Sequence, residues 1–298
     1  MTRIDLTATN GAIELAGSIW LPVNAEPNRL VLMHPGSGPS DRDNDVFFPP
    51  IRQALLDTGA AVASFDKRGV GASTGSWLEA SIEDQADDLL ASLRAVRQEV
   101  PDIPTGLFGH SQGGWVVLDA AARAAVDFVV TSSGPAVTPR VQEEFSTRNR
   151  LVGNDDVEQI LGSYGELFDR LSAGDSFDRV AEWMGEPSRS ASFVALESVG
   201  AFVPDGPVLW DFARLILDYD PAPALTALSV PLLALLGSAD TVVPVELSAD
   251  VFRERVRPDL LTLRIIEGGD HRMQFPHSDD FVPGYLPTLV EFVLGVAR

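Results

Sequence analysis

Residues 105–125 read TGLFGHSQGGWVVLDAAARAA, and this stretch decides the fold. An apolar run of strand length leads into Gly109-His110-Ser111-Gln112-Gly113-Gly114, and a helix-like segment follows over 115–125. A serine flanked by glycines in a tight turn between a strand and a helix is the pattern of a nucleophile elbow. The glycines fit where a Cβ would clash, and the strained turn exposes the serine hydroxyl. A glycine-rich turn with an incidental serine is the alternative, but the context favours Ser111 as a nucleophile.

A serine hydroxyl needs a base, and the sequence offers four histidines. His271 follows the last strand-like run, 261–266, in a short loop from which it could return over the elbow. The side chain of His110 is expected to point away from the serine Oγ, since it is the adjacent residue. His34 closes an early strand, and His277 lies in a proline-flanked loop typical of the surface. We therefore predict His271 as the general base.

The third member of such a site is a carboxylate that orients the imidazole and stabilises its cation. Asp240 lies in the loop after an apolar run, 230–236, and it gives the chain order serine, acid, histidine. Asp270 is adjacent to His271 and cannot easily reach its Nδ1. Asp218 and Asp220 precede the apolar run and are weaker rivals. The predicted triad is Ser111, Asp240 and His271.

Negative charge that develops on a carbonyl oxygen requires preorganised donors. The backbone N–H of Gln112, directly after the nucleophile, is the first predicted donor. The second is expected from the loop His34-Pro35-Gly36-Ser37-Gly38-Pro39, whose small residues let the main chain approach a substrate. We predict the N–H of Ser37, with Gly36 as the next candidate. A plain proline–glycine turn is the alternative.

Two further loops carry charged residues. Residues 66–73 read DKRGVGAS and lack the Gly-Lys-Ser/Thr step that opens the helix of a phosphate loop. We interpret this segment as a structural turn whose aspartate and arginine join neighbouring loops. Asp41, Asp43 and Asp45 could hold a metal, but their spacing lacks the glycine and the distal glutamate of a calcium loop. We expect no metal and no other cofactor.

Short apolar runs alternate with helix-like segments along most of the chain. A mixed stretch at 13–21 around Gly17 predicts an early antiparallel hairpin, and the apolar runs cover 30–33, 60–65, 105–108, 126–131, 230–236 and 261–266. The clearest helix extends from Ser81 to about residue 99, with Asp84 in a weak form of the capping box, and a last helix is expected over 281–296. This alternation predicts an α/β fold with a mostly parallel sheet covered on both faces.

The alternation is interrupted once, between 135 and 221. This segment is helix-like, contains proline and glycine breaks, and carries several aromatic residues, most of which we expect to form its own core while a minority line a pocket. We predict a core made of residues 1–134 and 222–298, with a helical cap at 135–221. The cap is placed where it would cover the carboxyl-terminal edge of the sheet.

The composition limits the partners of the protein. The 298 residues include 22 Lys and Arg and 43 Asp and Glu, so the formal net charge is −21, which disfavours nucleic acid and anionic membranes as partners. The absence of cysteine excludes disulfides and a thiolate nucleophile. The first ten residues are polar, and the apolar runs are too short to span a bilayer, so we expect a soluble cytoplasmic protein. The sequence leaves both a monomer and a homodimer open.

Taken together, these motifs resemble the α/β-hydrolase superfamily over nearly the whole chain. The loop 36–43 (GSGPSDRD), the turn 66–71 (DKRGVG) and the elbow 109–114 (GHSQGG) are similar to those of a branch of bacterial carboxylesterases with a helical cap. The resemblance implies metal-free hydrolysis of short-chain acyl esters through an acyl-enzyme. The chain departs from that branch at Pro35, because the histidine usual before the Gly-Ser-Gly-Pro run stands one place earlier, at His34. Haloalkane dehalogenases share the fold but need aspartate at the elbow, so Ser111 argues against them.

We therefore predict a serine hydrolase that cleaves a small-molecule carboxylic ester with a short to medium acyl chain. The same triad could serve a peptidase, a thioesterase, a lactonase or a C–C bond hydrolase, and a substrate panel would separate these activities. A non-enzymatic ligand-binding protein of the same fold is a second alternative, against which the intact triad argues.

Overall fold

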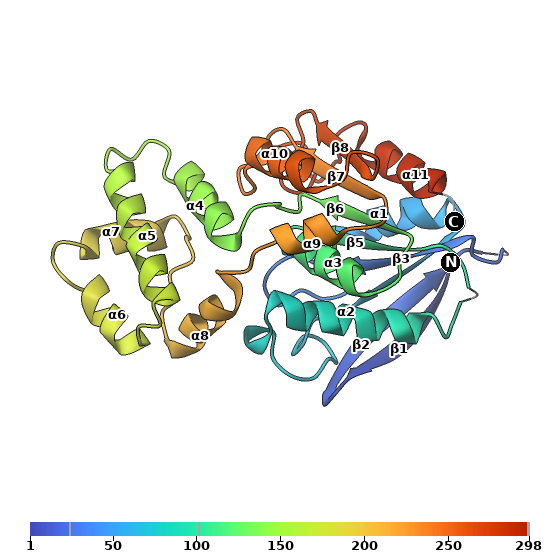
Figure 1. The fold of residues 1–298 in the computed structure, drawn as a ribbon, viewed down its shortest axis with the longest axis horizontal. Coiled ribbons are helices and arrows are strands. Elements are labelled where there is room, and N and C mark those ends of the chain that lie inside the picture. Colours follow the sequence, from blue (N-terminus) through green and yellow to red (C-terminus); the bar gives the residue numbers. More distant parts are fainter. Residues whose placement is uncertain (24, 101, 297–298) are drawn as a thin grey trace.

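The computed structural model describes residues 1–23, 25–100 and 102–296. Within these residues an eight-stranded sheet has the strand order β1-β2-β4-β3-β5-β6-β7-β8 (Figure 1). The strands are β1 (Thr2–Asn10), β2 (Ile13–Leu21), β3 (Arg29–His34), β4 (Ala60–Phe65), β5 (Thr105–His110), β6 (Phe128–Ser132), β7 (Leu232–Gly237) and β8 (Leu261–Ile266). β1 and β2 are antiparallel to their neighbours, and the pairs from β4 to β8 are parallel. The predicted α/β class with a mostly parallel sheet is confirmed.

The early hairpin differs from its prediction. Residues 13–21 form one strand, β2, whose hairpin partner is β1, and Gly11 takes the positive φ in the turn between them. Gly17 lies inside β2, where an added Cβ would come within 2.2 Å of the Phe65 ring. This glycine therefore allows the close approach of an aromatic side chain from β4. Local sequence does not distinguish a glycine that makes room for a distant side chain from a glycine that forms a turn.

Helices cover both faces of the sheet (Figure 1). On one face, α2 (Ile82–Val96), α3 (Gln112–Arg123), α9 (Ala222–Ala227) and α10 (Val245–Arg255) contribute to one core cluster, which includes Trp115 and Phe252. On the other face, α1 (Phe48–Leu56) and α11 (Tyr285–Gly295) contribute to a second cluster, which includes Leu289. Alternate side chains of β3 enter the two clusters. Burial on both faces explains why the strands read as continuous apolar runs.

Several predicted elements begin or end a few residues away from their observed bounds. β6 begins at Phe128 and β7 at Leu232, each two residues after the predicted start, and α11 begins at Tyr285 although the helix was expected from 281. α3 begins at Gln112, earlier than the expected 115. The two glycines after Gln112 have low intrinsic helix propensity, and tertiary packing overrides that preference here.

Of the six helices between β6 and β7 in the described chain, five, all except α9, lie beside the sheet domain (Figure 1). They are α4 (Pro139–Arg150), α5 (Val157–Ser172), α6 (Phe177–Met184), α7 (Ser190–Ser198) and α8 (Pro207–Ile216), and we call them the cap. The cap has its own apolar cluster, which includes Tyr164, Phe168, Trp183, Phe193 and Trp210. The five helices lie within the predicted segment 135–221, and the domain boundaries themselves stay a prediction.

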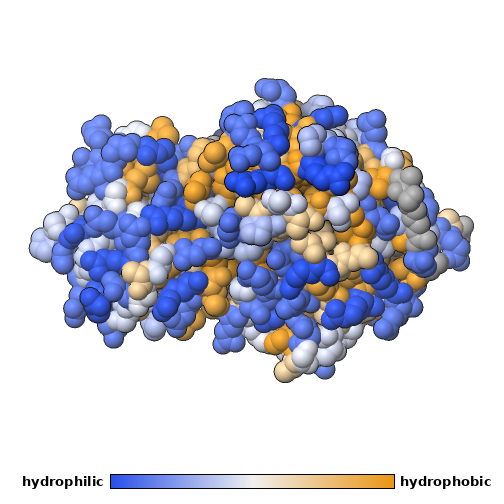
Figure 2. All heavy atoms as spheres, viewed as in Figure 1, coloured by the Kyte–Doolittle hydropathy of each residue, from blue (hydrophilic) through white to orange (hydrophobic). Residues whose placement is uncertain are grey.

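The surface is largely hydrophilic, and Figure 2 shows hydrophobic residues gathered near the middle of the view, where the cap meets the core. Two exposed ion pairs, Arg140 with Asp169 at 2.7 Å and Arg148 with Glu158 at 2.5 Å, connect the cap helices α4 and α5. Within residues 1–23, 25–100 and 102–296, every helix is too short or too polar to cross a bilayer.

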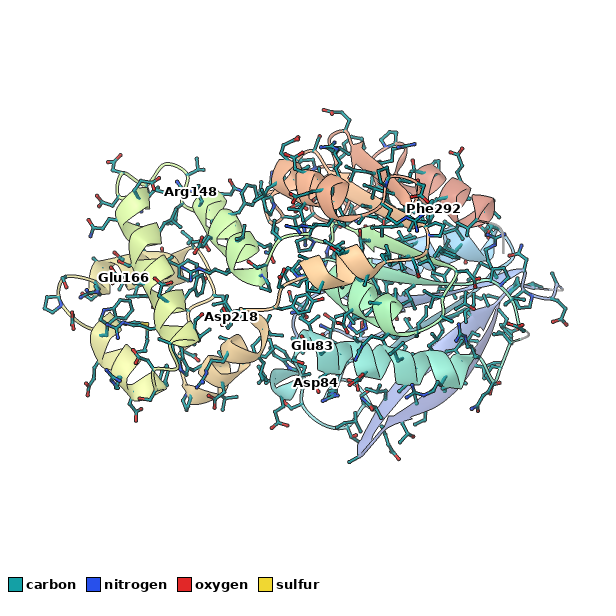
Figure 3. All side chains as sticks on the ribbon, viewed as in Figure 1. Glu83, Asp84, Arg148, Glu166, Asp218 and Phe292 are labelled. Carbon is teal, nitrogen blue, oxygen red and sulfur yellow. The ribbon has the colours of Figure 1, made fainter. Side chains whose placement is uncertain are left out.

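The start of α2 contains a complete capping box. Oγ of Ser81 accepts the N–H of Asp84 at 3.0 Å, and the carboxylate of Asp84, labelled in Figure 3, accepts the N–H of Ser81 at 3.0 Å. Two N–H groups that would lack an intrahelical acceptor are thereby satisfied.

Removing this cap has a measurable consequence for stability. Ser81→Ala is expected to lower the free energy of unfolding by about 1 kcal/mol, because the N–H of Asp84 loses its acceptor. For a chain of this size the melting temperature should fall by roughly 2 °C in differential scanning calorimetry. Ser198→Ala is the matched control, since that exposed hydroxyl only donates to the carbonyl of Ala195 and caps no helix start. Equal melting temperatures for the two variants would contradict the assignment.

Candidate active site

The turn at Ser111 joins β5 to α3. Its φ of 54° and ψ of −124° are unusual for a residue with a Cβ, and strain of this kind is found at functional sites. A Cβ added at Gly109 would lie 2.1 Å from the carbonyl oxygen of Gly113, and one added at Gly113 would lie 2.6 Å from the carbonyl oxygen of His34. The turn therefore requires both glycines, and it presents the serine at the carboxyl end of the sheet.

The three side chains of the predicted triad lie in a row. Nε2 of His271 is 2.9 Å from Oγ of Ser111, and Nδ1 of His271 is 2.9 Å from Oδ2 of Asp240. Because a carboxylate only accepts, the Nδ1–H donates to Asp240 and Nε2 is left to accept the serine hydroxyl. The side chain of Asp240 is fully buried, whereas that of His271 is 22% exposed. This arrangement can deprotonate a serine hydroxyl as the oxygen attacks a carbonyl carbon.

Asp240 is fixed by its own loop and by the sheet. Its Oδ1 accepts the N–H of Val242 at 2.7 Å and that of Val243 at 3.0 Å, which leaves Oδ2 for the histidine. The loop follows β7, and His271 follows β8, the parallel neighbour of β7. The topology thus brings the acid and the histidine to one edge of the sheet.

The predicted oxyanion donors lie beside Ser111. Gln112 is the first residue of α3, so its N–H is among those that have no intrahelical acceptor. Ser37 lies in the loop after β3, and a Cβ added at the preceding Gly36 would be 3.4 Å from Cβ of Ser111. Ser37 and Gln112 line the same cavity as Ser111 and His271. Their role as oxyanion donors stays a prediction.

The other three histidines lie outside the row. His110 has partners other than the serine: its Nε2–H donates to the carbonyl oxygen of His271 at 3.2 Å, and its ring packs on Phe47. Burial lowers the pKa of His110 well below its ordinary value. Burial also lowers the pKa of His34 to about 3, so this residue is neutral. His277 is exposed, in agreement with the sequence.

The rival carboxylates serve local structure. Asp270 accepts two backbone N–H groups of its own turn. Asp218, labelled in Figure 3, accepts the hydroxyl of the last residue of α5, and Asp220 accepts the first N–H of α9. None of these oxygen atoms binds the imidazole of His271 among the hydrogen bonds of the described residues.

The acidic loop after β3 is also held by local bonds. Asp41 accepts the N–H groups of Asp43 and Asp45, while Asp43 pairs with Arg52 at 2.8 Å and Asp45 with Arg272 at 3.3 Å. Across the part of the chain that the structure describes, no group of three potential metal ligands is found.

The turn after β4 contains a residue that the sequence did not single out. As predicted, its aspartate and arginine join neighbouring segments: Asp66 pairs with the arginine of the preceding loop and Arg68 with an aspartate of α2, both at 2.6 Å. Between them, Lys67 is buried, and its Nζ donates to the carbonyl oxygen of Gly36 and to Oε1 of Gln112. The sequence gives one signal for this residue: a lysine stands two places after the end of an apolar strand, with only Asp66 between them.

Two cavities meet at Ser111 and His271. One has a volume of about 570 Å³, lies between the cap and the core, and has mainly apolar walls that include Trp77, Trp115, Phe202, Phe212 and Ile216. The other has a volume of about 500 Å³ and is lined mainly by polar residues, including Ser40, Asp41, Asn44, Asp45 and Arg272. The serine therefore stands where an apolar chamber meets a polar one. Of the aromatic residues in the segment 135–221, Phe202 and Phe212 line the first cavity, whereas Tyr164, Phe168, Trp183, Phe193 and Trp210 pack in the interior of the cap.

The cap also contacts the loop that carries the acid. Nε2 of Gln142 donates to the carbonyl oxygen of Val242 at 3.4 Å, and Nδ2 of Asn149 donates to that of Thr241 at 2.9 Å. Both donors belong to α4. One cap helix is thus hydrogen-bonded to the residues directly after Asp240.

Comparison with known proteins places the chain in a family. A monoacylglycerol lipase of Mycolicibacterium smegmatis is 22% identical over 88% of this chain and 88% of its own length. Among solved structures, a proline iminopeptidase of Mycobacterium smegmatis (TM-score 0.63, 19% identity, 98% of both chains) and the esterase Pf2001 of Pyrococcus furiosus (TM-score 0.65, 18% identity, 100% of this chain and 92% of that one) share the fold. The family model described as serine aminopeptidase, S33 (Hydrolase_4) matches residues 45–276, well over half of the chain. With its sheet, its turn at Ser111 and this match, the chain belongs to that hydrolase family and to the α/β-hydrolase superfamily.

Proposed function

We propose that the protein is a serine hydrolase that cleaves carboxylic esters of short to medium acyl chain through an acyl-enzyme. The observation that carries the proposal is the row Asp240–His271–Ser111, with both contacts at 2.9 Å, at the place where the two cavities meet. A buried acid, an imidazole held in one tautomer and a serine in a strained turn are the parts that acyl transfer needs.

The mechanism follows from these positions. Ser111 attacks the ester carbonyl carbon while Nε2 of His271 takes the hydroxyl proton, and Asp240 stabilises the imidazolium that forms. The N–H groups of Gln112 and Ser37 stabilise the negative charge on the carbonyl oxygen. The imidazolium then protonates the leaving alcohol, and the C–O bond breaks to give the acyl-enzyme. Water attacks this second ester with His271 again as the base, which releases the acid and restores the serine.

The two cavities support a substrate with one apolar and one polar part. The apolar cavity, at about 570 Å³, is within the usual size of small-molecule sites, so it suits an alkyl or aryl group of moderate size. The polar cavity suits a hydroxylated or otherwise hydrophilic group. An ester that joins two such groups would place its carbonyl at Ser111. The relative named as a monoacylglycerol lipase is consistent with that substrate class.

A second candidate is cleavage of a short aminoacyl amide on the same triad. The carboxylate of Glu143 lines the apolar cavity and would attract a substrate ammonium group there. The description of the matched family as a serine aminopeptidase points in the same direction.

The test is a probe reaction followed by a substrate series. An uncharged fluorophosphonate should label the wild-type protein and leave Ser111→Ala unlabelled, because the probe phosphonylates an activated serine. p-Nitrophenyl acetate, butyrate, octanoate and laurate then give the acyl-length profile, beside aminoacyl amides, thioesters and lactones. We expect kcat/KM to be highest for an ester of the series. Preference for an aminoacyl amide would select the second candidate, and absence of both labelling and activity would leave only a ligand-binding role.

A further inference from the structure

Lys67 lies behind the candidate site at the end of three adjacent strands. The order β4-β3-β5 places the segments that follow these parallel strands next to one another. Those segments contain Lys67, Gly36 and Gln112, respectively. The lysine is 6% exposed, so its ammonium group is enclosed within the protein at this edge.

The ammonium group of Lys67 binds dipoles in place of a carboxylate. Nζ donates to the carbonyl oxygen of Gly36 at 2.5 Å and to Oε1 of Gln112 at 3.0 Å. Within residues 1–23, 25–100 and 102–296, Lys67 has no carboxylate partner. Asp66 pairs with Arg42, and Asp88 pairs with Arg68. Burial lowers the pKa of Lys67 to about 7.

A buried lysine without an ion-pair partner contributes little to the stability of the folded state. A buried amine without a counter-ion loses its hydration when it is protonated and gains only two dipolar contacts, so its net contribution to the stability of the fold is small. Stability therefore does not explain why this position holds a lysine.

The two acceptors of Lys67 belong to the two predicted oxyanion donors. Gly36 and Ser37 share one peptide group, and in a trans peptide the C=O and the N–H point in opposite directions. A cation that holds the carbonyl of Gly36 therefore turns the N–H of Ser37 to the other side of that peptide plane. The same cation holds the side chain of Gln112, whose backbone N–H is the other donor. Hydrogen bonding to the carbonyl also polarises the peptide and strengthens its N–H as a donor.

We propose that Lys67 is a positioning residue that fixes the orientation of the Gly36–Ser37 peptide, and with it the oxyanion donor Ser37 N–H, relative to Gln112, which carries the second donor. The proposal rests on the serine hydrolase function proposed above. Without the ammonium group, the Gly36–Ser37 peptide loses the interaction that sets its orientation, and the donor side of the site becomes less preorganised. The attack of Ser111 on a carbonyl or phosphonyl centre then becomes slower, whereas the apolar wall that the cap supplies to the substrate cavity is unchanged.

The decisive variant is Lys67→Met, which keeps the length of the side chain and removes the charge and the donors. We expect kcat for the best ester to fall roughly 10–100-fold with KM nearly unchanged, less than the loss of a whole donor. The rate of Ser111 phosphonylation by the uncharged fluorophosphonate should fall by a similar factor, because this reaction uses the same donors. The melting temperature should change little, because the relief from burying an amine and the loss of two hydrogen bonds oppose each other.

The matched control is Arg68→Met in the same turn. Arg68 pairs with Asp88 at 2.6 Å and makes no hydrogen bond to the loop 34–39. This variant should lower the melting temperature and leave both kcat and the phosphonylation rate of the folded enzyme near wild type. If Lys67→Met does not fold, Lys67→Gln takes its place, with an expected loss in kcat of at least about threefold.

The outcomes separate this inference from the proposed function. Values of kcat and phosphonylation rate within about twofold of wild type in a folded Lys67 variant would overturn the role of Lys67 while the esterase assignment stands. A fall in melting temperature of Lys67→Met, with unchanged kcat per folded molecule, would make the lysine merely structural. A wild-type protein that is neither labelled nor active would instead remove the serine hydrolase function, and the inference with it.

Discussion

Ser111→Ala is expected to reduce kcat on the best p-nitrophenyl ester by at least about 10⁴-fold, because no other group can form the acyl-enzyme. The methyl side chain of alanine leaves His271 and Asp240 in place, but no nucleophile is then available to attack the carbonyl carbon. The protein should remain folded, with an unchanged far-ultraviolet circular dichroism spectrum, since the substitution removes one oxygen atom from a side chain next to a cavity. Steady-state rates from protein purified free of contaminating hydrolases provide the measurement.

The matched control is Ser133→Ala. Ser133 is a buried serine at the end of the neighbouring strand, it too has a positive φ, of 49°, and its hydroxyl has no hydrogen-bond partner among the described residues. This control tests whether removing a hydroxyl from a strained, buried serine at this edge of the sheet affects catalysis in general. Its kcat should stay near wild type. Comparable activity of Ser111→Ala and wild type would eliminate Ser111 as the nucleophile.

Asp240→Asn should lower kcat by about 10³–10⁴-fold while the protein keeps its fold. The amide oxygen can still accept the N–H groups of Val242 and Val243, so the NH₂ group must face His271. It then donates to Nδ1, which forces the imidazole proton onto Nε2, the atom that has to accept the proton of Ser111. The loss should appear in kcat more than in KM, since the side chain of Asp240 is fully buried and does not line the substrate cavity.

Asp270→Asn provides the comparison for this second variant. Asp270 is adjacent to His271 and accepts the backbone N–H groups of Arg272 and Gln274. An asparagine oxygen can accept the same two bonds, so kcat should change by less than about tenfold. A larger loss in Asp270→Asn than in Asp240→Asn would show that the acid of the site had been assigned to the wrong loop.

Those parts of the site that depend on local sequence were predictable. The strand, the strained turn and the helix around Ser111 lie within about twenty residues, and glycines mark the turn by steric necessity. Asp240 and His271 follow two consecutive strands that pair in parallel, so chain order alone brought them to the same edge. The structure places the three side chains in contact. Their proximity could be predicted because it needed only short segments of sequence and the shared direction of the parallel strands.

The features that depend on strand order were not predictable. β1 was missed because its hydrogen bonds are made to β2, and Gly17 was misread because the ring that fills its space belongs to Phe65, far away in the chain. The contacts of Lys67 could not be predicted for the same reason. Its partners are segments 31 and 45 residues away, and they become neighbours only because β3 lies between β4 and β5. A linear pattern contains no signal for such a juxtaposition.

The two bonds from α4 to the loop after β7 connect a wall of the apolar cavity to the loop that carries Asp240. Gln142 and Asn149 hold the carbonyl groups of Val242 and Thr241, and the N–H groups of Val242 and Val243 hold Asp240. The same helix supplies part of the wall of the apolar cavity, so a ligand that displaced α4 would break its bonds to the segment on which the carboxylate depends. Enlarging the cavity by moving this helix would therefore disturb the loop of the acid and is expected to lower turnover.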